Sequence, residues 1–246
     1  MRKCMIVIFV ALITVWGCSP EPPKTEEQKT LYALGAHLNK QLSLFDLTSE
    51  ELKFVVQGLS DASSGKKLAV DPEAQITKIG ELAQSRVPKI AAKSKAAAKP
   101  FLEKAAAAPG AQKTASGLIY KEIKAGTGVR ATPKDIVTVH YVGSLIDGKE
   151  FDSSIKRGKP LEIPLDRIIP CWTEGISMMK VGGKAELVCP PETAYGDAGR
   201  PPVVAGGSTL VFQVELLDVK SGEPPPAASP APDKAQAKSK KRAPTR

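Results

Sequence analysis

Hydrophobic residues recur at two different spacings along the chain, and the spacing changes near residue 110. Between residues 25 and 87, leucine, isoleucine and valine return every three or four positions, which is the period of an amphipathic α-helix. From residue 118 onward they gather in short segments, some of which alternate with polar residues as half-buried β-strands do. The pattern predicts an α+β protein, in which a helical domain precedes a domain built on an antiparallel sheet.

Three helices are predicted in the first half, and each begins at a capping signal. Thr25 and Thr48 each stand three residues before a glutamine or glutamate, which makes a capping box, and Asp71 precedes a first-turn proline. The apolar stripes that follow are Leu31, Leu34, Leu38 and Leu42; Leu52, Val55, Val56 and Leu59; and Ile76, Ile79, Leu82 and Ala83. Because so few helices make a poor core alone, we expect a second copy of the chain to bury these stripes, as a homodimer through residues 25–87.

Two prolines interrupt the third helical pattern. Pro88 and Pro100 each remove a backbone hydrogen bond, so the helix should kink or break there. Two interpretations remain open for this stretch. It is either a long helix that carries the second domain outward, or a bent linker rich in alanine and lysine over residues 89–108 that is helical only in part.

The second half reads as strands around one short helix. Residues 118–124 predict a strand, and residues 136–145 are apolar at both parities, as in a central strand packed on both sides. Asp147 with Gly148 is a hairpin turn signal. We therefore expect an antiparallel half-barrel that wraps around a short helix.

The short helix and the last strand complete this predicted core. Residues 172–180 predict the helix, with Ile176 and Met179 on its inner face. Residues 210–216 alternate apolar and more polar positions, which directs Phe212 to the core that the helix covers.

The first 18 residues have the parts of an export signal. Arg2 and Lys3 precede an apolar run, residues 5–15, that is too short to span a bilayer comfortably. The sequence VWGC that ends at Cys18 resembles a lipoprotein box, which implies removal of residues 1–17, lipidation of Cys18 and anchoring in the bacterial cell envelope. With serine after the cysteine, periplasmic anchoring to the outer membrane is expected. An ordinary secretory signal and an uncleaved anchor are the alternatives.

The formal charge of +9 is concentrated at the ends of the chain. Arg2 and Lys3 and the basic tail, residues 221–246, carry most of it, so the body between them is nearly balanced and a nucleic-acid function is discounted. The tail is rich in proline, alanine and lysine and cannot form a core. It either contacts an anionic surface or is merely solvated. Residues 18–24 form a short polar tether.

Several separated motifs in residues 117–220 occur together and in order. They are HYVG, DGKEFDSS, PLEI, CWTEGI and AYG. This part of the chain resembles the FK506-binding-protein family of peptidyl-prolyl cis-trans isomerases, and we place that domain at residues 114–220. Residues 25–110, with YALG at 32–35, resemble the helical dimerisation domain that precedes many exported members of the family. The resemblance implies isomerisation of Xaa-Pro bonds in unfolded or folding polypeptides, without a cofactor.

The resemblance also implies a set of site residues. The catalytic group is Tyr141, Asp152 and Tyr195, and the substrate-binding group is Phe151, Arg157, Leu161, Ile168, Ile169, Trp172 and Phe212. In the family, the tryptophan is the platform under the proline ring, and Asp152 would meet the rotating carbonyl electrostatically. The backbone N–H of Ile169 and the hydroxyl of Tyr195 would bind substrate carbonyls.

Some positions depart from the family or have a structural interpretation. Leu161 stands where an aromatic wall is usual, and Cys171 replaces the glycine before the tryptophan. Cys171 and Cys189 either form a disulfide in an oxidising compartment or remain two buried thiols. His140 is interpreted as structural, because its parity along the strand points it away from Tyr141. The two histidines and four cysteines show no metal-ligand spacing.

These patterns lead to one functional hypothesis and two rivals. The hypothesis is a membrane-tethered dimeric isomerase that accelerates cis/trans conversion in exported proteins. The rivals are a periplasmic binding chaperone with incidental isomerase activity, and an envelope lipoprotein whose barrel has lost its activity.

Overall fold

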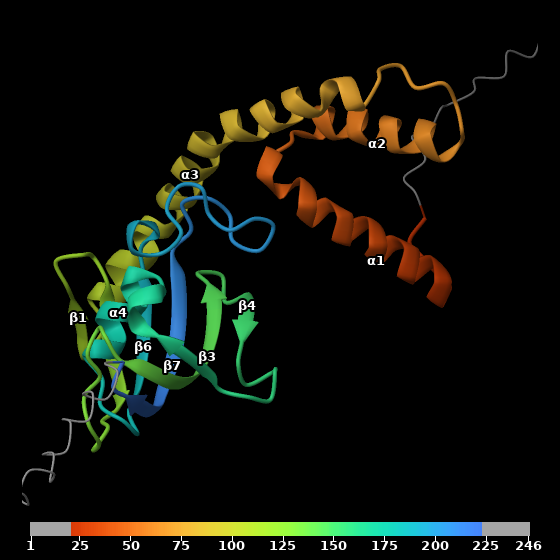
Figure 1. The fold of residues 1–246 in the computed structure, drawn as a ribbon. Helices are drawn as coiled ribbons and strands as arrows, with labels where there is room; N and C mark the ends of the chain where they lie inside the picture. Colours follow the sequence, from red (N-terminus) through yellow and green to blue (C-terminus); the bar gives the residue numbers. More distant parts are fainter. Residues whose placement is uncertain (1–20, 223–246) are drawn as a thin grey trace, which may run out of the picture. The chain divides into compact units, whose positions relative to one another are not determined.

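The computed structural model describes residues 21–222, which form an α+β protein (Figure 1). The helical part comprises α1 (Glu26–Gln41), α2 (Ser49–Ser63) and α3 (Ile76–Ala106). The sheet part comprises β1 (Ala111–Lys113), β2 (Ile119–Lys124), β3 (Ile136–Leu145), β4 (Glu150–Ser153), β5 (Leu161–Pro164), α4 (Pro170–Ser177), β6 (Lys184–Cys189) and β7 (Leu210–Lys220). The predicted fold class is confirmed. The predicted signal segment, Cys18 and nearly all of the predicted tail lie outside the described residues.

Helix α1 belongs to a compact unit that ends at Lys40, and the rest of the chain forms a second unit. The predicted capping box at its start is present, because the N–H of Gln28 donates to the Thr25 hydroxyl at 3.1 Å while the Gln28 side chain accepts from the Thr25 N–H. Leu31, Leu34 and Leu38 are all exposed along the helix. Within the described residues, α1 therefore exposes its apolar stripe to solvent.

Helix α2 begins at the second predicted capping box. Thr48 accepts from the N–H of Glu51, and the Glu51 carboxylate accepts from the N–H of Thr48 at 2.8 Å. The same carboxylate forms an ion pair with Arg86 of α3 at 2.5 Å. These contacts, with the backbone N–H of Thr48 the largest cause, lower the pKa of Glu51 to about 2. Glu51 thus joins the start of α2 to α3.

Helix α3 runs without interruption through Pro88 and Pro100, so of the expected kink or break at these residues, the break is wrong. The helix begins at Ile76, after a 3-10 turn over Glu73–Gln75 that follows the predicted cap at Asp71. The alternative of a partly helical linker is likewise wrong, because residues 89–106 are all helical. A proline in a helix costs one hydrogen bond and crowds the preceding turn, so other contacts must hold α3 together.

Several such contacts follow Pro88 along the helix. Asp46 forms ion pairs with Lys89 and Lys93 at 3.1 and 3.0 Å. Further along, Ala91 and Ala98 are buried against the sheet part, and a Cβ on Gly207 would lie 2.5 Å from the carbonyl oxygen of Ala91. These contacts between α3 and other elements stabilise the helix. They could not be recognised from local sequence patterns.

One antiparallel sheet of seven strands organises the second half. Its order is β1-β2-β6-β7-β3-β4. One edge of β3 pairs with β7 over Ile136–Leu145, and the other edge pairs first with β5 and then with β4. Helix α4 covers the sheet, and its buried side chains join those of β2, β3, β6 and β7 in one core.

Most of the predicted strands are confirmed, with two corrections. The Asp147–Gly148 turn joins β3 to β4, with Gly148 at a φ of 81°. Strand β3 buries alternate residues and leaves the others partly exposed, so the expectation of equal packing on both faces is wrong. The short helix begins at Pro170 and ends at Ser177, so Met179 packs into the core from beyond its end. Among residues 21–222, no helix combines the length and apolar content needed to cross a bilayer.

Candidate functional site

Four aromatic rings from four elements meet at one end of the core. Trp172 of α4 lies edge-on to Tyr141 of β3, with ring centroids 4.9 Å apart, and edge-on to Phe212 of β7 at 5.3 Å. Phe212 in turn meets Phe151 of β4 at 5.7 Å. Edge-to-face packing of this kind stabilises aromatic pairs beyond the area that they bury. The predicted aromatic set is therefore brought together.

A glycine that the sequence analysis did not single out makes room for these rings. Gly143 pairs with Phe212 across β3 and β7. A Cβ at this position would lie 2.8 Å from the Phe151 ring and 2.9 Å from the Phe212 ring, which is closer than packed atoms approach. Gly143 is the last residue of the HYVG motif, so the motif pointed to this position. The reason that a glycine is needed there is steric and appears only in the structure.

The rings differ in depth. Trp172 is 2% exposed, and Tyr141 and Phe212 are also buried. The surrounding residues are partly exposed and pack against this core; they are Phe151, Leu161, Ile168, Ile169 and Tyr195. The indole of Trp172 thus lies deep in the core, whereas the residues around it reach the surface.

A polar triad borders the aromatic cluster. The hydroxyl of Tyr141 donates to the Asp152 carboxylate at 2.5 Å, and Arg157 forms an ion pair with the same carboxylate. Arg157 also donates to the Tyr141 hydroxyl at 2.9 Å, with its guanidinium carbon 5.4 Å from the Tyr141 ring centroid. Each member is held by the other two, so the three side chains are fixed relative to one another.

These contacts determine the charges at neutral pH. Burial raises the pKa of Tyr141, and the hydrogen bond to Asp152 raises it further. Burial alone would raise the pKa of Asp152, but the Tyr141 hydroxyl and the Arg157 guanidinium outweigh it and lower this pKa overall. Tyr141 is therefore neutral and Asp152 ionised, and neither is prepared to transfer a proton near pH 7.

Ser154, which was not predicted as a site residue, fixes the strand beneath the triad. Its hydroxyl accepts from the backbone N–H of Tyr141 at 2.8 Å and lies 3.0 Å from Nδ1 of His140. His140 thus has the structural contact that its parity predicted. The EFDSS segment carries Ser154, yet a buried serine in a turn gives no sequence signal for this role.

Two polar groups beside the aromatic cluster are available to an external partner. The backbone N–H of Ile169, just before α4, and the hydroxyl of Tyr195 have no hydrogen-bond partner among residues 21–222. Tyr195 follows the 3-10 turn Pro191–Thr193, and its carbonyl accepts from the N–H of Gly199 at 3.1 Å. Both groups can therefore bind an external carbonyl. Within the described part of the chain, no three His, Cys, Asp or Glu side chains are grouped to hold a metal ion.

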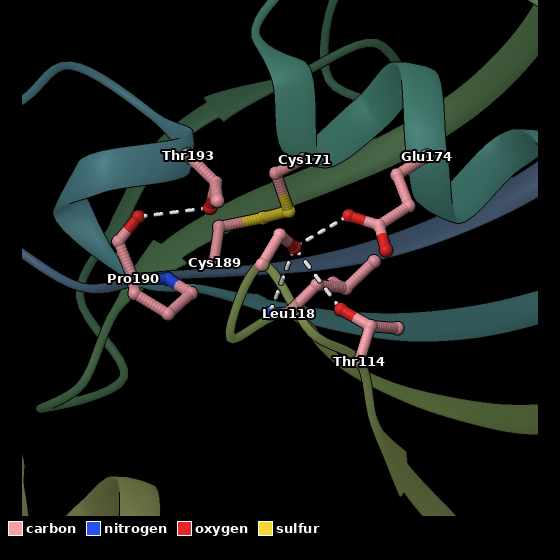
Figure 2. Close-up of a disulfide and its surroundings, with 8 residues drawn as sticks. Thr114, Leu118, Cys171, Glu174, Cys189, Pro190 and Thr193 are labelled. Carbon is pink, nitrogen blue, oxygen red and sulfur yellow. Dashed lines mark hydrogen bonds between the residues drawn. A yellow bond between two sulfur atoms is a disulfide. The ribbon is translucent and has the colours of Figure 1, made fainter.

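The open question about the cysteines is answered by a disulfide. Cys171 at the start of α4 is bonded to Cys189 at the end of β6, with Cα atoms 5.7 Å apart (Figure 2). This separation lies in the usual range for disulfides. The alternative of two buried thiols is therefore wrong for this structure.

Comparisons with known proteins agree with this fold. Residues 128–217 match the model for FKBP-type peptidyl-prolyl cis-trans isomerase, and residues 27–121 match the model for the domain amino-terminal to it. The chain is 41% identical over 222 residues to the FKBP-type peptidyl-prolyl cis-trans isomerase FkpA of Escherichia coli, covering 85% of this chain and 81% of that one. It is 39% identical over 199 residues to the 22 kDa FKBP-type isomerase of Escherichia coli, covering 79% of this chain and 96% of that one.

A solved structure gives the same result. The crystal structure of FkpA from Escherichia coli aligns with a TM-score of 0.60 at 40% identity, covering 81% of this chain and 99% of that one. Identity, coverage and fold coincide across both the helical and the sheet parts. The chain belongs to the family of FKBP-type peptidyl-prolyl cis-trans isomerases.

Proposed function

We propose that this isomerase binds a prolyl segment over Trp172 and catalyses rotation with the residues around that ring. The side walls are Phe151, Leu161, Ile168 and Phe212, and Tyr141, Asp152 and Arg157 form the polar side. The observation that carries the proposal is the convergence of the four aromatic rings and the polar triad from β3, β4, β7 and α4.

The chemistry needs no covalent step. Rotation about the C–N bond loses amide resonance and has a barrier of about 18–20 kcal/mol. The twisted amide is less dipolar than the planar one, so a water-poor apolar site favours it over the ground state, provided that binding offsets desolvation. The partly exposed walls supply that environment, and the deep floor keeps their spacing fixed.

The polar groups have separate roles in this proposal. The N–H of Ile169 and the hydroxyl of Tyr195 bind substrate carbonyls and so fix the chain on both sides of the proline. The ionised Asp152, held by Tyr141 and Arg157, acts on the carbonyl that rotates. Because its partners hold it in place, it contributes a fixed field without reorganisation.

Export, lipidation and dimerisation belong to the same proposal. The export signal and Cys18, which lie outside the described residues, support a periplasmic enzyme that is anchored to the outer membrane through acyl chains. The exposed apolar stripes of α1, α2 and α3, within residues 25–87, support a homodimer. Residues 25–110 then form the dimerisation domain, followed by the isomerase domain at 114–220.

A binding chaperone is the second candidate, and one observation favours it. Phe54 of α2 is 75% exposed, among other apolar side chains on the helices. Such a surface could hold unfolded clients independently of the sheet part. Under this alternative, peptide isomerisation and client binding would depend on different residues.

Substitution of the polar triad tests the assignment and separates the two candidates. Asp152→Asn should lower kcat/KM for a short Xaa-Pro peptide at least tenfold, because the fixed negative charge is lost. Asp218→Asn, an exposed site on β7, is the matched control and should have no effect. Unchanged peptide turnover in Asp152→Asn would refute the assignment. Unchanged suppression of client aggregation together with lost turnover would favour a separate chaperone surface.

A further inference from the structure

The Cys171–Cys189 disulfide lies between the two segments that carry Trp172 and Tyr195. Cys171 directly precedes Trp172, and Cys189 ends β6 six residues before Tyr195. Both cysteines are fully buried. Figure 2 shows the bond between the first turn of α4 and the end of the strand.

The bond is one of the contacts between α4 and β6. A second close approach is at Gly175, where an added Cβ would lie 2.7 Å from the Leu187 side chain. Cys171 and Gly175 are one helical turn apart and share a face. Leu187 and Cys189 are two residues apart and share a face of the strand. The disulfide therefore ties the N-terminal turn of α4, where Trp172 lies, to the end of β6. The hydroxyl of Thr173 holds the same turn on another side, because it donates to the carbonyl of Leu165 at 2.5 Å.

The path from Cys189 to Tyr195 is short and internally hydrogen-bonded. The N–H and the hydroxyl of Thr193 both donate to the carbonyl of Pro190 at 3.0 Å, and Figure 2 shows the hydroxyl contact. The N–H of Gly196 donates to the carbonyl of Pro191 at 2.8 Å. A displacement at Cys189 would thus be transmitted to Tyr195.

A further hydrogen bond holds the outer side of α4. Glu174 accepts from the Ser116 hydroxyl at 2.5 Å, and the same hydroxyl lies 3.0 Å from that of Thr114. This contact joins α4 to the segment before β2. It does not connect the floor of the site to the Tyr195 segment.

We propose that the Cys171–Cys189 disulfide is a positioning element of the prolyl site, which fixes Trp172 relative to Tyr195. The two cysteines touch no substrate; they act through the residues that follow them. The inference rests on the proposed assignment of Trp172 and Tyr195. Because an apolar site favours the twisted amide only when its walls are already in place, loosening the first turn of α4 should lower turnover in protein that is still folded.

The test compares the oxidised full chain with the Cys171→Ala/Cys189→Ala variant. Every protein also carries Trp16→Phe, so that Trp172 is the single tryptophan reporter. Turnover of a short Xaa-Pro peptide and the near-ultraviolet circular dichroism of Trp172 are measured at a temperature where each protein is folded. We expect about a tenfold loss in kcat/KM and a weaker Trp172 signal. A second variant, Cys171→Val/Cys189→Ala, refills the volume and answers the same question if the first does not fold.

Val137→Ala is the matched control, because it loosens the buried part of β3 away from the disulfide. It should lower thermal stability while kcat/KM and the Trp172 signal stay within twofold of the parent. An equal loss of turnover in this control would overturn the inference, as would unchanged turnover in the disulfide variant. Peptide mapping without reductant that shows no link between the two cysteines would also overturn it.

One further pair of variants separates this inference from the proposed site. Trp172→Leu and Tyr195→Phe should each lower kcat/KM. If neither does, the site assignment itself fails. If both do and the disulfide variant retains full turnover, the site stands and only the positioning role is refuted.

Discussion

The sheet part and the helical part bury their apolar residues to very different extents. Val139 of β3 is 0% exposed within a core that the sheet and α4 complete by themselves, whereas Val56 of α2 is 55% exposed. Apolar side chains on the described helices are exposed in the same way, up to 75% for Phe54. The sheet part has a buried core like that of an independent domain. The helices have exposed apolar surfaces of the kind that usually bind a partner.

This difference separates two requirements of the enzyme. In the proposed mechanism, catalysis depends on side chains that α4 and the sheet fix within one chain. Association depends on stripes whose partner we propose to be a second copy. Damage to the sheet part should therefore leave association largely intact, and damage to the helices should leave catalysis largely intact.

The largest expected effect on stability comes from an aspartate in the sheet part, compared with an aspartate in the helical part. Val139→Asp buries an unpaired carboxylate and should destabilise the sheet part by more than about 4 kcal/mol, abolishing peptide turnover. Val56→Asp should leave turnover per chain within twofold and lower the native mass from dimer to monomer. Urea denaturation, peptide assay and native mass spectrometry measure these effects. Equal loss of turnover in both variants would remove the distinction between the regions.

Removal of the disulfide should have the next largest effect on stability, confined to the sheet part. The bond closes a loop with a sequence separation of 18, for which loop-closure entropy predicts about 3 kcal/mol. Calorimetry of the Cys171→Ala/Cys189→Ala variant should show a lower transition for this part. A change in the native mass, or a helical transition lowered by the same amount, would contradict the separation.

A smaller effect is expected at the start of α2 as pH falls. The pKa of Glu51 is lowered from 4.5 to about 2, so its ionised form stabilises the folded helix above the unfolded pKa. That contribution should be lost as pH falls from about 4.5 toward 2. The difference in melting temperature between wild type and Glu51→Gln, followed by circular dichroism, should therefore shrink over this range. Glu50→Gln, which removes an exposed ion pair with Lys53, is the neighbouring control, and the trend should be larger for Glu51→Gln than for this control.

The smallest expected effect is on turnover near neutral pH. The pKa of Asp152 is lowered and that of Tyr141 is raised. Because the usual pKa values are about 3.9 for Asp and about 10 for Tyr, neither group titrates between about pH 5 and pH 8. We expect kcat/KM for an Xaa-Pro peptide to be constant over this range. A bell-shaped profile centred in this range would show that proton transfer limits the reaction, against the proposed mechanism.

The sequence was sufficient where structure is local or where motifs occur in order. The capping boxes at Thr25 and Thr48 depend on residues three positions apart, so both could be recognised before the fold was known. The convergence of Tyr141, Phe151 and Trp172 followed from the order of family motifs, since no local pattern brings β3, β4 and α4 together.

Features that depend on distant contacts could not be predicted. Helix α3 continues through Pro88, and residues after this proline, such as Lys89, make contacts with other elements. Local helix propensity gives no information about such contacts. Predicting the disulfide would have required knowledge of the distance between α4 and β6. The steric role of Gly143 required the register that places it beside two rings.

Titration of the full chain with a short Xaa-Pro peptide, followed by nuclear magnetic resonance, tests the central claim most directly. We predict that the amide of Ile169, the rings of Phe151 and Tyr195 and the indole N–H of Trp172 shift together as the peptide binds. Exchange between the cis and trans peptide signals should accelerate over the same titration, while α2 is unaffected. Accelerated exchange with shifts confined to the helices, and none around Trp172, would contradict the account.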